Sequence, residues 1–176
     1  MGFAPVEAAK YLVKEGHGDR FTIIGVDLVY MHATRPAFKG LALLEANLHT
    51  WEPLQEFDLI TCVHGLHYIG DKLDLIARAV SWLSIDGVFK ANLDLSNLRL
   101  ETGKPASKKV LKLFQQAKIS YNRNRHILSC YGRRELFVPF IYQGADDKAG
   151  PNYTGQSAVN SYYDLGGYPR HRLDSG

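Results

Sequence analysis

Cysteine is scarce in this sequence, and long apolar runs are absent from it. The two cysteines, Cys62 and Cys130, are too few for a disulfide framework, and both lie in apolar, strand-like runs. Buried free thiols in a reducing compartment are therefore expected. No run approaches the roughly 18 apolar residues of a membrane span, and no charged start followed by an apolar stretch indicates a signal peptide. These absences predict a cytoplasmic globular protein without a membrane partner.

Acidic residues are absent from residues 104–134, although the whole chain carries a net charge of only +3. The cations of this basic segment are Lys104, Lys108, Lys109, Lys112, Lys118, Arg123, Arg125, Arg133 and Arg134. A basic patch of this kind can attract nucleic acid or an anionic substrate. The alternative is a solvated helix face beside an edge strand that cations protect from pairing. We favour the alternative because no aromatic residue interleaves with the helical lysines.

The spacing of apolar residues predicts helices that alternate with strands. Helices are expected over residues 4–15, 31–39 and 107–118, and over a stretch that Asp71 caps and that runs to about Leu83. Strands are expected over residues 21–26, 41–46, 57–63, 88–93, 126–131 and 135–142, with a turn at Ile85-Asp86-Gly87. The last two strands, separated by Gly132-Arg133-Arg134, are expected to pair as an antiparallel hairpin. This order predicts an α/β fold with a doubly wound, mostly parallel sheet and a C-terminal antiparallel hairpin.

The length favours one domain. We expect a core over residues 1–143 and a Gly- and Tyr-rich segment over residues 144–176 that packs on this core through Tyr153, Tyr162 and Tyr163.

A carboxylate stands directly after the first predicted strand. Asp27 follows the apolar run Phe21–Val26, and open α/β sheets bind ligands outside the carboxyl ends of their strands. A carboxylate can accept two hydrogen bonds from a ribose diol. Asp27 therefore indicates a site for a nucleotide-type cofactor, and the alternative is a residue that only begins a turn or helix.

From Ala4 to about Tyr142 the sequence resembles the class I S-adenosylmethionine-dependent methyltransferases, which have a Rossmann-like fold. The matching stretches, in the order and spacing of that family, are Val26-Asp27, Glu45-Ala46-Asn47-Leu48, Phe57 to His67 and Asp86-Gly87-Val88-Phe89. The resemblance implies S-adenosylmethionine as cofactor and direct methyl transfer to an acceptor, with a small molecule as the default. It implies no specific catalytic residue and no metal.

The resemblance also assigns a cofactor-binding role to eight residues. Asp27 would bind the ribose hydroxyls, and Leu28 would pack beside the adenine. Ala46, Asn47 and Leu48 would line the adenine pocket. Val63 and His64 would lie under the methionine end, and Gly2 would remain from the glycine-rich loop.

The family's glycine-rich loop and the strand before it are otherwise missing from this sequence. We therefore expect an N-terminally truncated methyltransferase core that lacks the first, central strand and binds the cofactor poorly or not at all. The chain can then be inactive, and its exposed sheet edges can pair with a second copy in a homodimer.

Several other interpretations stay open. His64 and His67 invite a metal site, but no third ligand follows at a suitable spacing, so a hydrogen-bonded histidine in the pocket wall is favoured. A general base that acts on the methyl acceptor is a further alternative for one of them. The stretch 144–153, with Asp146 and Asp147 among glycines, either covers a ligand pocket or forms an Asx-turn connector. Competing functions are a non-catalytic Rossmann-like binding protein that has lost its cofactor site and a nicotinamide-dependent oxidoreductase.

Overall fold

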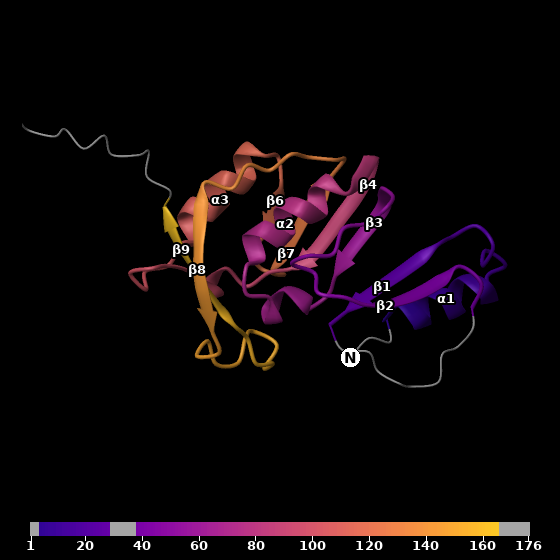
Figure 1. The fold of residues 1–176 in the computed structure, drawn as a ribbon, viewed down its shortest axis with the longest axis horizontal. Helices are drawn as coiled ribbons and strands as arrows, with labels where there is room; N and C mark the ends of the chain where they lie inside the picture. The colour runs from indigo at the N-terminus through magenta and orange to yellow at the C-terminus, as the bar shows by residue number, and fades with distance from the viewer. Residues whose placement is uncertain (1–3, 29–37, 166–176) are drawn as a thin grey trace, which may run out of the picture. The chain divides into compact units, whose positions relative to one another are not determined.

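A computed structural model of the chain describes residues 4–28 and 38–165. Over these residues the protein is mixed α/β, with three α-helices and three small sheets (Figure 1). The predicted α/β class is confirmed, whereas a single doubly wound parallel sheet is not observed. The chain divides into two compact units, Met1–Glu52 and Pro53–Gly176, and each is described by itself below. No helix of the described residues is long and apolar enough to cross a membrane.

The first unit contains one helix and a pair of parallel strands. Helix α1 (Ala4–Lys14) precedes β1 (Ile23–Asp27) and β2 (Leu41–Glu45), as predicted. A Cβ on Gly25 would lie 2.9 Å from Pro5 Cγ, so glycine allows the start of α1 to approach β1 closely. The predicted helix over 31–39 falls almost wholly outside the described residues.

The second unit contains a four-stranded sheet in the order β3-β4-β7-β6. Strands β3 (Phe57–Cys62) and β4 (Leu83–Asn92) are parallel. Strand β7 (Ile127–Tyr131) runs antiparallel to both β4 and β6 (Ser120–Asn122). Strands β4 and β6 therefore run in the same direction, with one reversed strand between them.

The turn predicted at Ile85-Asp86-Gly87 is a bulge inside β4 instead. Phe57 lies opposite Leu83, but Leu59 lies opposite Val88. The β4 residues between Leu83 and Val88 therefore outnumber the β3 residues that they face. The prediction was wrong because a bulge and a turn use the same residue types, and only the partner strand distinguishes them.

Two helices in the second unit supply much of its core. Helix α2 (Lys72–Ser81) contacts β4, and helix α3 (Ser107–Gln116) contacts β6. Most of the apolar residues predicted from the helical spacing are buried: Leu73, Ile76 and Val80 on α2, and Val110 and Phe114 on α3. The other predicted residues of these two helices, Ala77 and Leu111, are half-buried. Asp71 caps α2 as predicted, because its Oδ1 accepts a hydrogen bond from the Asp74 N–H at 3.1 Å.

A third sheet, in the order β5-β9-β8, differs from the prediction. Strand β9 (Asn160–Leu165) pairs parallel with β5 (Leu98–Leu100) and antiparallel with β8 (Phe140–Asp146). Neither β5 nor β9 was expected from the sequence. Strand β5 has only three residues, and β9 lies in a stretch without a clear alternation of apolar and polar residues.

The predicted hairpin between residues 126–131 and 135–142 is wrong, since β7 and β8 lie in different sheets. The backbone N–H groups of Gly132, Arg133 and Arg134 donate to the carbonyls of Gly87, Ser84 and Val80. The connector is thereby tied to β4 and the end of α2, and it carries the chain away from β7.

Both cysteines are free, as expected. Cys130 is buried, and Cys62 is half-buried at the end of β3.

Candidate functional site

Five of the eight predicted cofactor-binding residues lie where β1 and β2 end: Asp27, Leu28, Ala46, Asn47 and Leu48. Asp27 is opposite Glu45 in the register, and its carbonyl accepts a hydrogen bond from the Ala46 N–H at 2.9 Å. Asp27 and Leu28 are exposed, and Leu28 keeps 66% of its surface accessible. The parallel pairing thus brings the end of β1, with an accessible carboxylate and an accessible apolar side chain, beside the end of β2.

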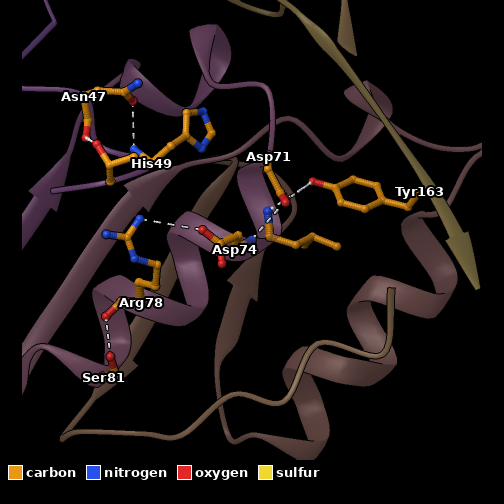
Figure 2. A network of polar contacts seen from close by, with 9 residues as sticks. Asn47, His49, Asp71, Asp74, Arg78, Ser81 and Tyr163 are labelled. Atoms are coloured by element: carbon orange, nitrogen blue, oxygen red, sulfur yellow. Dashed lines mark hydrogen bonds and ion pairs between the residues drawn. The ribbon is translucent and has the colours of Figure 1, made fainter. Parts of the chain in front are cut away.

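Asn47 organises the turn that follows β2. Its Oδ1 accepts from the His49 N–H at 3.0 Å (Figure 2), and its carbonyl accepts from the N–H groups of Thr50 and Trp51. The side-chain oxygen is therefore engaged in an Asx-type turn.

The other three predicted residues lie elsewhere. Gly2 is outside the described residues. Val63 and His64 belong to the second unit, directly after β3, where Val63 is 65% exposed. His64 adopts a left-handed conformation with φ of 61°, which redirects the chain into a short 3-10 helix, Gly65–Tyr68.

A buried histidine lies on this 3-10 helix. His67 has no accessible surface, and neither of its ring nitrogens has a hydrogen-bond partner. Burial lowers the pKa of His67, and the neighbouring His64 acts in the same direction, whereas Asp94 opposes the shift. The imidazole of His67 is therefore neutral at pH 7, with one N–H donor and one lone pair.

His67 belongs to a cluster of rings, and two of these rings contact it directly. The His64 ring stacks on it at 5.7 Å between centroids, and Tyr153 meets it edge-on at 5.6 Å. Tyr153 also stacks face to face on His126 at 4.0 Å, with 9° between the ring planes. The hydroxyl of Tyr121 lies 3.2 Å from His126 Nδ1 and donates to the Leu93 carbonyl at 2.8 Å. We call His64, His67, Tyr121, His126 and Tyr153 the histidine–tyrosine cluster.

The cluster lies at one edge of the four-stranded sheet. His64 follows β3, and His126 immediately precedes β7, whose first residue pairs with Asn92 at the end of β4. The cluster is thus at the carboxyl ends of the parallel strands β3 and β4, the edge at which open α/β sheets bind ligands.

Sequence reasoning selected His64 and His67 but missed Tyr121 and His126 as members of this site. Tyr153 was expected to pack on the core and belonged to the stretch 144–153, but it was not assigned to a site with the histidines. Since more than 80 residues separate His67 from Tyr153 along the chain, no local pattern could have joined them. Among the described residues no three His, Cys, Asp or Glu side chains are arranged to hold a metal ion.

A buried lysine holds the C-terminal strand against α2 near the cluster. The Lys72 ammonium donates to the Ile69 carbonyl at 2.8 Å, the Val159 carbonyl at 2.7 Å and Ser161 Oγ at 2.8 Å. The Val159 N–H in turn donates to the His67 carbonyl at 2.9 Å. These bonds fix the segment before β9 on one side of His67.

A second polar tie joins β9 to α2 (Figure 2). The Tyr163 hydroxyl contacts Asp71 at the start of α2, and Asp74 forms an ion pair with Arg78 one turn further on, at 3.7 Å. Ser81 donates to the Arg78 carbonyl at 2.7 Å near the end of the helix. The N-terminal half of α2 is thus held by an ion pair within the helix and by a hydrogen bond from Tyr163 on β9.

The basic segment lies on α3, β6 and β7. Lys108, Lys109 and Lys112 are exposed on α3. A shallow groove of about 470 Å³ lies beside α3 and β6, and Lys118 and Arg123 are among its lining residues. This surface therefore combines positive charge with a groove that an anionic molecule can enter.

Comparison with curated proteins finds similarity to trans-aconitate 2-methyltransferases. The matches from Rhizobium leguminosarum bv. trifolii and Rhizobium etli are each 25% identical over 93 residues. The aligned part is 53% of this chain and 36% of each relative, so the chain spans about a third of the length of these relatives. No family model matches the chain, and no solved structure matches it. The relationship to methyltransferases is therefore distant and partial.

Proposed function

We propose that this chain is a class I S-adenosylmethionine-dependent methyltransferase core that acts on a small-molecule acceptor. The observation that carries the proposal is the similarity over 93 residues to two enzymes whose names specify a small methyl acceptor, trans-aconitate. The doubly wound sheet of that family, without its first strand, is part of this proposal.

The residues at the ends of β1 and β2 suit the proposed cofactor. The accessible Asp27 carboxylate can accept hydrogen bonds from two ribose hydroxyls, and Leu28 offers apolar surface to one face of an adenine. Ala46, Asn47 and Leu48 would complete the adenine site. Val63, His64 and Gly2 would approach the methionine end, as the family resemblance implies.

S-adenosylmethionine supplies an electrophilic methyl group when it is bound. The chain's own residues would hold the acceptor in line with that methyl, so proximity and orientation are the main contributions of the protein. No covalent enzyme intermediate is required, because the acceptor atom attacks the methyl carbon directly.

Calorimetric titration with S-adenosylhomocysteine tests the cofactor site. We expect weak or no binding to the 176-residue chain and clear binding to an N-terminally extended version that supplies the family's glycine-rich loop. In the extended version Asp27→Asn should weaken binding about tenfold or more, because one charge-assisted acceptor for the ribose is lost. Asp19→Asn is the matched control, since Asp19 is an exposed carboxylate of the same unit that pairs with Lys39.

Four results would change this proposal. Tight binding to the 176-residue chain would show that the glycine-rich loop is not needed for the cofactor, and an Asp27→Asn variant that binds like the control would remove the ribose role. Thermal protection by NAD but not by S-adenosylhomocysteine would favour an oxidoreductase. Salt-sensitive binding of RNA to the basic segment would replace the small-molecule acceptor with a nucleic acid.

A non-catalytic association role is the second candidate, and exposed apolar residues on β3 and directly after it favour this role. Leu59 and Val63 are 61% and 65% exposed, and β3 is the outer strand of its sheet over the described residues. An exposed apolar edge can pair with another chain. Sedimentation that shows a concentration-dependent dimer, together with no cofactor binding by the extended chain, would support this candidate.

A further inference from the structure

The unpartnered nitrogens of the histidine–tyrosine cluster need an explanation. Nearly all buried polar side-chain atoms in folded proteins have a hydrogen-bond partner, which can be ordered water or a ligand. Both ring nitrogens of His67 and Nδ1 of His64 are buried without one. Three unpartnered nitrogens on two stacked rings mark a place where a polar group of another molecule fits.

The charged residues near His67 are already engaged. The Lys72 ammonium uses all three of its protons on Ile69, Val159 and Ser161. The Asp94 carboxylate accepts from the N–H of Ser96 at 2.9 Å and from its hydroxyl at 2.7 Å. A carboxylate entering this place would find no cation with a proton to spare, and Asp94 would repel it.

A neutral hydroxyl group suits the cluster better. A hydroxyl donates one hydrogen bond and accepts others, and the neutral His67 imidazole offers one lone pair and one N–H. A hydroxyl bound there satisfies both groups at once, without placing an uncompensated charge in a buried site.

Tyr153 covers this place from the solvent side. Its ring contacts both His67 and His126 while 40% of its surface stays accessible. The turn that carries it is closed on itself, because Asn152 Oδ1 accepts from Thr154 N at 2.7 Å and Gln156 N at 3.2 Å. The Tyr153 side chain also forms a hydrogen bond with Asn92, the last residue of β4, and this bond holds the ring over the cluster.

We propose that His67 and His64, covered by Tyr153, form a binding site for the hydroxyl group of a neutral small molecule. The assignment of this molecule as the methyl acceptor rests on the proposed function, whereas its binding does not. The site therefore distinguishes hydroxyl-bearing acceptors from carboxylates such as the trans-aconitate named for the relatives.

Imidazole resonances in NMR spectra test the proposal on the whole chain without cofactor. The probe is cyclohexanol, and cyclohexanecarboxylate is its charged counterpart with the same ring. We expect cyclohexanol to shift the His67 and His64 signals at millimolar concentration, and the carboxylate to bind at least fivefold more weakly. His67→Leu should weaken cyclohexanol binding at least fivefold, and His17→Gln, at an exposed histidine of the first unit, should leave it unchanged.

Other outcomes overturn the proposal. If cyclohexanol shifts neither imidazole, the missing partner is water alone. If the carboxylate binds as well as the alcohol, the site is not selective for a neutral hydroxyl. If circular dichroism shows that His67→Leu does not fold, the cyclohexanol titration is repeated with His64→Leu. Unchanged cyclohexanol binding by that variant would also overturn the proposal. Since no cofactor takes part, a failed cofactor titration leaves this result unaffected.

Discussion

The Tyr163 hydroxyl donates to Asp71 Oδ1 at 3.1 Å and accepts from the Leu73 N–H at 3.2 Å. One side chain of the last described strand thus completes the N-terminus of α2, where helices leave N–H groups without a partner. Burial, reinforced by the Asp71 charge, raises the pKa of Tyr163 well above its ordinary value. The phenol therefore stays neutral and keeps both bonds over the accessible pH range.

Removing this hydroxyl should destabilise the protein. Tyr163→Phe leaves the buried Leu73 N–H without its partner, and we expect the free energy of unfolding to fall by about 1–3 kcal/mol. Tyr162→Phe is the matched control, because the neighbouring Tyr162 hydroxyl donates to the half-buried Asp146 at 3.0 Å and not to α2. Urea unfolding measures both variants. If both variants lose the same unfolding free energy, the contact of Tyr163 with α2 does not stabilise the protein more than the Tyr162 contact does.

The pH dependence of stability should report the buried Lys72. Burial lowers the pKa of Lys72 from its ordinary 10.5 to about 8, against the opposing charge of Asp71. Between these two values the unfolded chain binds a proton that the folded chain has released, so stability rises with pH in this window. Relative to Lys72→Met, the wild type should gain about 2 kcal/mol between pH 7 and pH 9.5. If the difference in unfolding free energy between the wild type and Lys72→Met is the same at both pH values, the lowered pKa of Lys72 is refuted.

His67 should make the protein sensitive to mild acid. Because burial lowers its pKa below the ordinary 6.5, protons bind preferentially to the unfolded chain as the pH falls through 6.5. The wild type should therefore lose stability relative to His67→Leu between pH 7.5 and pH 5. Thermal unfolding midpoints of the two proteins measure this difference. A difference that is constant over this range would show that His67 titrates as it does in the unfolded chain.

Two glycines with the same backbone conformation should differ in their tolerance of a side chain. Gly132 and Gly103 have φ values of 74° and 78°, so alanine is strained by about 1 kcal/mol at either position. A Cβ on Gly132 would lie 2.7 Å from the Ile85 carbonyl oxygen, whereas nothing lies within 4 Å at Gly103. Gly132→Ala should therefore cost roughly 1–3 kcal/mol more than Gly103→Ala in urea unfolding. Equal costs would mean that the connector after β7 adjusts freely.

Local patterns in the sequence were reliable where one element determines its own form. The helical spacing of buried residues predicted α1, α2 and α3, and Asp71 was identified as a cap, because these features depend on residues within a few positions. The strand ending at Asp27 was likewise found from its apolar run.

Pairing between distant strands was not predictable in this way. The run at 135–142 was taken as the partner of 126–131, yet β8 pairs with β9, a strand about 20 residues further on. A strand's own residues specify that it is extended and which side is apolar, but its partner is selected by packing across the whole unit.

The sequence by itself determined the mixed α/β class, the positions of α1, α2 and α3, and the place of Asp27 at a strand end, since each follows from periodicity or from one residue at one place. Only the tertiary structure decided that His67 is buried without partners beneath Tyr153, with His126 stacked on the same tyrosine. These residues meet because β3, β4 and β7 bring their ends to one edge of a sheet. Burial and hydrogen bonding depend on that assembly rather than on any neighbouring residue in the chain.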